Sequence, residues 1–368
     1  MMRFMKKYLL AVIALALVIP GAARGQELMT EQSNLLRARV VEVVRQERRL
    51  IPGTQVEATY QVITAQVIDG PQAGMRIELE NDRMILKAGD VFFANRFVAS
   101  DEITYSVQDL ERRPQLILFV VLFVCVIVVF GGVQGVRSLV SLAGSLLVIA
   151  YILLPGILGG YSPVLLSTGV ATIVLCVAIY FTHGFNKEST AAFLGTVLSV
   201  VCTGLLASFA ISYAHLSGFD SDESVYLNLS TNGTLNISGL LLGSIMIGVL
   251  GVLDDVAITQ VSVVRELYHT APHLGKRELY TKAIRVGKEH VGALVNTLAL
   301  AYTGASLPLL LLFSRGTTSA SVALNYEVFA TEIIRTIVGS IGLVLTVPVV
   351  TILAVYMLAP HQVTDEVN

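Results

Sequence analysis

The hydrophobic positions of this chain follow two different patterns, which change over near residue 113. Before that point apolar and polar residues alternate over short stretches, which is typical of half-buried β-strands. After it, apolar residues form runs long enough to cross the hydrocarbon core of a bilayer as helices. The pattern therefore predicts an α-helical polytopic membrane protein that carries a small all-β domain at its N-terminal end.

The transmembrane domain is predicted over residues 115–358, and a short cytoplasmic tail over 359–368. Polar segments and glycine- or proline-containing turns separate the apolar runs within it. Seven runs are long enough to span a membrane. The predicted helices cover residues 115–133, 138–158, 163–182, 189–214, 237–264, 291–313 and 331–358.

The first 25 residues have the pattern of an export signal. Arg3, Lys6 and Lys7 precede an apolar run over residues 8–19, which is shorter than the roughly twenty residues that a spanning helix needs. Small residues follow Pro20 and offer cleavage points. A signal peptide and an uncleaved signal anchor both fit residues 1–25, and either one would export the domain that follows.

The exported β-domain is predicted over residues 27–112. Turn-forming segments at 69–74 and 87–90 separate its alternating stretches, and together they indicate a compact, OB-like barrel of about five strands. OB-like barrels often bind nucleic acid through a basic groove with stacking aromatic residues. Here acidic residues balance basic ones and aromatic residues are few, so no nucleic acid is expected as a partner. The alternating apolar positions are Val56, Ala58, Tyr60 and Val62 in one stretch, and Met75, Ile77 and Leu79 in another.

Composition supports the membrane assignment. Hydrophobic residues make up 54% and charged residues 14% of the 368 residues, and the mean hydropathy is +0.72. One soluble core cannot bury so much apolar surface, so the lipid bilayer is the expected partner of the helices.

The distribution of Lys and Arg predicts the orientation in the membrane. If the β-domain lies outside, the cytoplasmic segments contain most of the basic residues near helix ends, and the C-terminus lies in the cytoplasm. Arg112, Arg113 and Arg315 lie on the other side and are outnumbered. The basic residues on the predicted cytoplasmic side are Arg137, Lys187, Arg265, Lys276, Arg277, Lys282, Arg285 and Lys288.

The fifth predicted helix contains two carboxylates, Asp254 and Asp255. A charged side chain inside a membrane costs several kcal/mol unless it is paired, hydrated or protonated, so such residues are candidates for an ion or proton site. Helical spacing places Asp255, more than Asp254, on a stripe of small and hydroxyl residues that we expect to face the bundle. Close helix packing is predicted at four glycines of this helix, Gly239, Gly243, Gly248 and Gly251.

The sixth predicted helix offers Asn296 and Thr297 as partners for Asp255. Counted at 1.5 Å per residue from the cytoplasmic side, the three residues lie at a similar depth, roughly 10 to 13 Å. A hydrogen bond between Asp255 and either partner is therefore geometrically possible. Two interpretations remain open: an ion or proton site that also uses Asn296 and Thr297, and a structural polar clamp between helices.

Catalysis and cofactor binding are not expected. His269, His273 and His290 lack metal-ligand spacing, and there is no loop of the type that holds nucleotide phosphates. An intramembrane aspartyl protease would need aspartates on two helices, and only the fifth helix has any. We therefore predict neither an enzyme nor a cofactor or metal site. Glu332 and Arg335 are three residues apart and are expected to pair as an anchor at the outer membrane surface.

Several motifs in the second half of the chain are similar to those of the YibE/F family of bacterial membrane proteins. They are GVLDDVAIT at 251–259, VNTLALAYTGASLPLLLLF at 295–313 and EIIRTIVGSIGLVLTVPVV at 332–350. The resemblance implies a multi-pass protein of the bacterial cytoplasmic membrane, and it pairs Gly251 with Asp255 as glycine and membrane aspartate. The segment from Gly132 to Arg137 is less basic than the usual family form. The family carries no established activity.

Two functional hypotheses follow. The first is a secondary transporter or permease with an intramembrane carboxylate that binds an ion or a proton. The second is a membrane scaffold that transports nothing, in which the exported β-domain binds a protein or envelope component. A water-accessible cavity that reaches Asp255 would favour transport, and a fully packed bundle would favour the scaffold.

Overall fold

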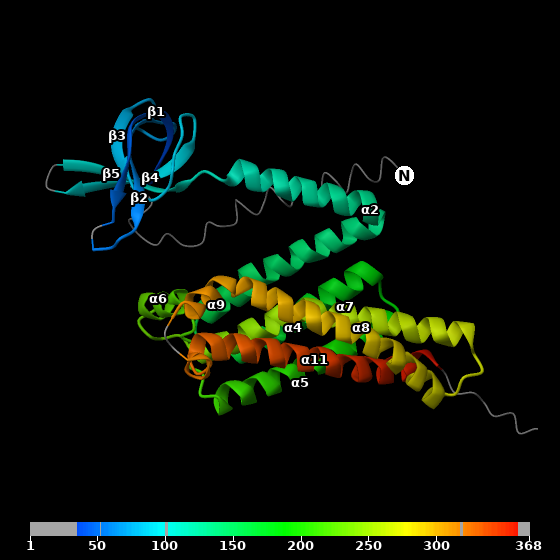
Figure 1. The fold of residues 1–368 in the computed structure, drawn as a ribbon. Coiled ribbons are helices and arrows are strands. Elements are labelled where there is room, and N and C mark those ends of the chain that lie inside the picture. Colours follow the sequence, from blue (N-terminus) through cyan, green and yellow to red (C-terminus); the bar gives the residue numbers. More distant parts are fainter. Residues whose placement is uncertain (1–34, 52, 100–101, 317–318, 360–368) are drawn as a thin grey trace, which may run out of the picture. The chain divides into compact units, whose positions relative to one another are not determined.

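Figure 1 shows the chain as a computed structural model, which describes residues 35–51, 53–99, 102–316 and 319–359. The chain divides into two compact units, Met1–Gly132 and Val133–Asn368. The predicted export signal, residues 1–25, lies outside the described residues.

The N-terminal unit contains a closed five-stranded barrel with the strand order β1-β2-β3-β5-β4. The long strand β1 pairs antiparallel with both β2 and β4, and β3 runs parallel to β5. The predicted small β-domain of about five strands is therefore confirmed. Its strands are β1 Leu35–Leu50, β2 Glu57–Val67, β3 Arg76–Asn81, β4 Val91–Ala99 and β5 Glu102–Leu110.

Both predicted turns of the barrel are present. Gly70 and Gly74 between β2 and β3 have φ of +80° and +90°, a left-handed conformation that favours glycine. Before β4, the backbone N–H of Lys87 donates to Asp90 Oδ2 at 2.8 Å, and Gly89 has φ of +94°. Local turn chemistry therefore determines where these strands end.

The alternation predicted for β2 has the wrong phase. Val56 is 59% exposed, whereas Gln61 is fully buried, and the inward positions of β2 continue from Gln61 through Ile63 to Val67. Gln61 can point inward because its amide accepts from the N–H of Leu86 and donates to the carbonyl of Leu86, both at 2.9 Å. A buried amide with such partners replaces the apolar residue that the pattern alone would require.

The C-terminal unit is a bundle of helices built around α7 (Figure 1). Five helices of the described chain are long and apolar enough to cross a membrane, and α8 with α9 forms a sixth candidate that is bent by 62°. The helical elements are α2 Arg113–Val148, η2 Ile149–Leu153, α3 Leu154–Leu158, α4 Pro163–His183, α5 Lys187–Tyr213, α6 Asp222–Ser230, α7 Ile237–Thr270, α8 Lys276–Ala305, α9 Leu307–Ser314, α10 Ala320–Ala323 and α11 Glu327–Leu358.

The helices differ from the predicted seven at two places. The first two predicted helices are parts of one 46-residue element, Arg113–Leu158, which is interrupted at Gly132 by non-helical angles (φ 53°, ψ −131°). The sixth predicted helix begins at Lys276 instead of residue 291 and bends after Ala305. The bend lies directly before Pro308, which has no N–H to continue the helical hydrogen bonds.

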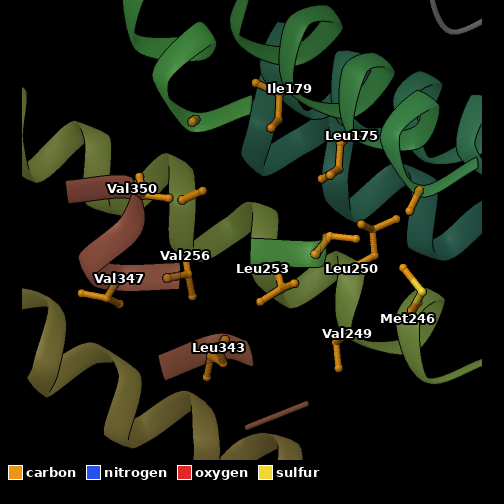
Figure 2. Packing of buried hydrophobic residues seen from close by; sticks show 14 of the residues in the cluster. Leu175, Ile179, Met246, Val249, Leu250, Leu253, Val256, Leu343, Val347 and Val350 are labelled. Atoms are coloured by element: carbon orange, nitrogen blue, oxygen red, sulfur yellow. The ribbon is translucent and has the colours of Figure 1, made fainter. Parts of the chain in front are cut away.

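The core of the bundle lies where α7 contacts its neighbours. Figure 2 shows Leu250, Leu253 and Val256 of α7 among buried side chains of α4 and α11. Glycines allow the helices to approach closely. A Cβ added at Gly195 of α5 would lie 2.6 Å from Val350 Cγ2 of α11, and one at Gly339 of α11 would lie 2.6 Å from Val249 Cγ1 of α7.

Candidate functional site

A cleft of about 400 Å³ lies between the second part of α2, α4 and α7, and both Asp254 and Asp255 line it. Asp254 is half-buried and Asp255 is exposed. The α7 wall contains Ile247, Gly251 and Asp254, which lie on one face because they are four and three residues apart. Asp254 therefore lies at the centre of the face that borders the cleft.

The opposite walls supply hydroxyl and imidazole groups. Ser138, Ser141 and Ser145 of α2 face the cleft because they are three and four residues apart on one helix. Thr182 and His183 reach it from the last turn of α4. The cleft thus has carboxylates on one helix and hydroxyls on two others, with hydrocarbon side chains between them.

Two of these hydroxyls border the cleft and belong to residues that are otherwise buried. Ser141 is 4% exposed and Thr182 is 9% exposed. Ser145 donates its own hydroxyl to the carbonyl of Ser141 at 3.0 Å. Among the residues that the structure describes, neither the Ser141 hydroxyl nor the Thr182 hydroxyl makes a side-chain hydrogen bond, so both are available to a molecule in the cleft.

The predicted stripe on α7 does not face the packed bundle. Gly248, Gly251, Asp255 and Thr259 are all exposed. A Cβ added at Gly251 would meet nothing within 4 Å, so this glycine is not a packing contact. The prediction of close packing there is wrong, because the stripe borders the cleft and the outer surface of α7.

The other three glycines do lie near a second helix. A Cβ at Gly243 would lie 2.5 Å from Ser167 Oγ of α4, and one at Gly239 would lie 3.2 Å from Cγ of Pro163. A Cβ added at Gly248 would lie 2.9 Å from the hydroxyl oxygen of Tyr302 on α8. Close approach is therefore found at Gly239, Gly243 and Gly248.

The structure does not bring Asn296 and Thr297 to Asp255. Both residues are exposed on α8 and neither lines the cleft. The Thr297 hydroxyl donates to the carbonyl of Ala293 at 3.0 Å, and no hydrogen bond within the described chain joins Asp255 to Asn296. A similar depth along the two helices does not bring these residues together, because Asp255 faces α2 and α4 and not α8.

A structural polar clamp is present at Gln260 instead. This buried side chain of α7 donates through Nε2 to the carbonyl of Ala283 on α8 at 3.0 Å and to Thr351 Oγ1 on α11 at 2.8 Å. Gly287 leaves space for it, since a Cβ there would lie 2.6 Å from Gln260 Oε1. One amide therefore connects three helices.

The predicted pair of Glu332 and Arg335 is present at the other end of the bundle. Arg335 Nη1 donates to Glu332 Oε1 at 2.5 Å, and Arg335 Nη2 lies 3.6 Å from Asp220 Oδ2. Burial raises the pKa of Asp220, although the charge of Arg335 acts in the opposite direction. Arg335 thus connects α11 to the loop after α5 instead of extending alone toward water. It also lines a cavity of about 260 Å³ together with Asp220 and with Ser244 of α7, which we call the second cavity.

The serines of α2 and the amide of Gln260 are functional or structural polar groups that were not predicted from the sequence. A signal for the serines exists, because Ser138, Ser141 and Ser145 recur at helical spacing inside an apolar run. No comparable signal exists for Gln260, since its partners lie on two other helices.

These features indicate a polytopic α-helical protein of the membrane class, with a polar site inside its bundle. The family model described as YibE/F-like protein matches residues 119–360. The chain therefore belongs to the YibE/F-like family, as its motifs predict. The matched segment begins within α2 and does not include the barrel. No curated protein and no solved structure matches the chain.

Proposed function

We propose that this protein is a membrane permease that moves a proton or another cation, with Asp254 and Asp255 as its ion site. The observation that carries the proposal is the cleft that reaches both carboxylates in a helix of membrane-spanning length. A bundle that only anchored an exported domain would have no need of acidic residues there, because each costs free energy in a membrane. The proposal includes no chemical reaction and no cofactor.

The contents of the cleft fit ion binding. A carboxylate binds a proton or a cation directly, and hydroxyl groups can replace part of the water that a cation loses on entry. Asp254 lies opposite the serines of α2, and no Lys or Arg in the described part of the chain forms a salt bridge with it. Its carboxyl group is therefore available to a bound proton or cation.

The proposed location is the bacterial cytoplasmic membrane, with the β-domain outside and the C-terminus in the cytoplasm. His183 ends α4 at the cleft, and the next helix begins with Lys187. Arg265, near the end of α7, forms a salt bridge with Glu188 at 2.8 Å. Basic residues therefore lie near this end of the bundle, which is the end that the positive-inside rule assigns to the cytoplasm.

Seven crossings remain part of the proposal. At about 1.5 Å per residue the 46-residue element Arg113–Leu158 would be roughly 69 Å long, more than twice the thickness of a hydrocarbon core. Two crossings that meet at Gly132 would accommodate this length. Together with the bent pair α8 and α9 and the four other candidate helices, this gives the predicted number.

An OB-like assignment of the barrel is also proposed. The closed order β1-β2-β3-β5-β4 with a parallel β3–β5 pair supports it, as does the long β1 that is shared by both halves of the barrel. Its function is expected to be protein or envelope recognition instead of nucleic-acid binding.

The test is ion flux in proteoliposomes. We expect proton or cation flux in the wild type, and at least a tenfold loss in Asp254→Asn and in Asp255→Asn at equal protein insertion. Glu266→Gln is the matched control, because Glu266 is an exposed acid of the same helix outside the cleft. Absence of flux in the wild type across protons and common inorganic cations, together with organic ones, would exclude the permease.

The scaffold is the second candidate, and one observation favours it. The far end of the β1–β2 hairpin exposes apolar side chains, with Leu50 at 62% and Val56 at 59% exposure. Exposed apolar residues at the tip of an exported hairpin suit contact with a protein or envelope component. Crosslinking from Leu50→Cys in intact cells would test this. A specific crosslinked species, together with absent flux, would support the scaffold.

A further inference from the structure

The volume of the cleft is larger than an ion needs. One water molecule occupies about 30 Å³, and sites for small organic ligands begin at about 300 Å³. The cleft of about 400 Å³ falls within the second range. A proton or a bare metal ion would occupy only a small part of this volume.

Hydrocarbon forms most of the walls between the polar groups. Leu142 and Leu146 of α2, Ile179 of α4 and Leu250 of α7 all line the cleft. Such side chains gain free energy from contact with an apolar ligand but offer nothing to an inorganic ion. The occupant therefore needs hydrocarbon as well as charge.

The polar groups define what else the occupant must carry. The negative charge of Asp254 and Asp255 calls for a cation. The hydroxyls of Ser141 and Thr182 line the cleft and make no side-chain hydrogen bond in the described chain, so they are free to bond to an occupant. A hydroxyl can accept a hydrogen bond from an N–H group while a carboxylate on the facing helix neutralises the charge.

We infer that the cleft binds a small organic cation that has N–H donors on a hydrocarbon body, such as a primary ammonium. The inference rests on the proposed function and identifies the class of cation. In this site the ammonium lies between the α7 carboxylates and the hydroxyls of α2 and α4. The hydrocarbon body lies against the leucine and isoleucine side chains.

The experiment measures equilibrium binding to the purified full chain in nanodiscs, so that it does not depend on transport. The probes are 2-phenylethylammonium, its N,N,N-trimethyl derivative, the neutral 2-phenylethanol and sodium ion. We expect 2-phenylethylammonium to bind at least about tenfold more tightly than the other three, because only it combines charge, N–H donors and hydrocarbon. Equal binding of the trimethyl derivative or of the alcohol would overturn the inference.

Variants locate the binding. Asp254→Asn should weaken binding of 2-phenylethylammonium by about tenfold or more, and Ser141→Ala by about threefold or more, which are the usual effects of losing a charged and a weaker hydrogen bond. Glu266→Gln should leave binding unchanged. Unaltered binding in Asp254→Asn, with the variant folded as judged by its melting temperature, would contradict the assignment to this cleft.

The binding and flux experiments test the two proposals separately. Selective binding of 2-phenylethylammonium without flux of any cation would retain this site and exclude the permease. Proton or inorganic cation flux that depends on Asp254, with no selective binding of the organic ammonium, would retain the permease and overturn the inference.

Discussion

Gln260 and Asp254 lie on the same helix less than two turns apart, yet their surroundings differ. The amide of Gln260 is 2% exposed and donates to groups of two other helices. Asp254 borders a cleft in which the nearby hydroxyls of Ser141 and Thr182 have no partner within the described chain. A polar side chain that makes all its hydrogen bonds within the protein stabilises the fold. Several polar side chains that still lack partners are suited to binding a ligand. One face of α7 is therefore structural and another is available for binding.

The barrel contains the clearest example of completed polar contacts. Gln61 donates to Gln46 and Leu86, and it accepts from Asn81 at 3.1 Å and from Leu86. Gln61→Ala would leave several buried groups unpaired, so we expect a loss of roughly 3 kcal/mol or more in local stability. Hydrogen exchange of the β2 and β3 amides in the full chain measures this. Gln66→Ala, at a more exposed position of the same strand, is the control. Unchanged exchange in Gln61→Ala would mean that the network contributes little.

Gln260 should show the same behaviour on a smaller scale. Gln260→Ala removes two interhelical hydrogen bonds and leaves a cavity between α7, α8 and α11, so we expect about 1–3 kcal/mol of destabilisation. The melting temperature of the purified protein in detergent checks it. Thr259→Ala alters the exposed neighbouring residue and should have little effect. Equal melting temperatures for both variants would remove the distinction between the two faces of α7.

Two glycine-to-alanine substitutions should change the stability of the protein in opposite directions. Gly195→Ala places a Cβ 3.1 Å from Val350 Cα and 2.6 Å from its Cγ2, so α5 and α11 must separate at a cost of about 1–3 kcal/mol. Gly251→Ala meets nothing within 4 Å and should gain up to about 1 kcal/mol from helix propensity. Thermal unfolding of both variants distinguishes the packed side from the cleft side. A higher melting temperature in Gly195→Ala would show that α5 and α11 can move apart without loss of stability.

The pH dependence of stability should report on Asp220. Its pKa is raised by burial, so the folded protein favours the protonated form. The contribution of protonated Asp220 to stability is complete below about pH 4, the ordinary pKa of aspartate. It is lost as the pH rises through the raised pKa of Asp220. Asp220→Asn should lose this dependence, because an amide does not titrate. Melting temperatures from pH 3.5 to pH 7 measure it, with the exposed Asp222→Asn as control. An identical pH profile in wild type and Asp220→Asn would contradict the role of burial.

The smallest expected change is at the cleft itself. Ser141→Ala and Thr182→Val each remove a hydroxyl that has no partner within the described structure, so stability should change by less than about 0.5 kcal/mol. The same melting experiment checks this in the absence of added amines. A loss of more than 1 kcal/mol would show that these hydroxyls have a structural role, and the comparison between Gln260 and the cleft would fail.

Local patterns were enough to predict most of the elements. The turns at Gly70 and Gly89, the start of α4 at Pro163 and the apolar lengths of the helices all depend on residues close together in the sequence. The phase of β2 could not be predicted in this way. It depends on Gln61 finding Leu86, which lies 25 residues away.

The candidate site could be predicted only in part. Asp254 and Asp255 are visible in the sequence as carboxylates in an apolar run. Their neighbours are not, because the direction in which Asp255 points depends on how α4 and α2 pack against α7. Asn296 was a reasonable partner by depth, but depth gives one coordinate and the rotation of each helix about its axis gives the other.

The central helix has a mechanical consequence. The wall of the second cavity includes Leu240 and Ser244 of α7, and the wall of the cleft includes Ile247 and Asp254 of the same helix. In the same part of α7, Met246 lies against Gly204 of α5, and Val249 lies against Gly339 of α11. Because one helix borders both cavities, any shift of α7 would change the shape of both at once.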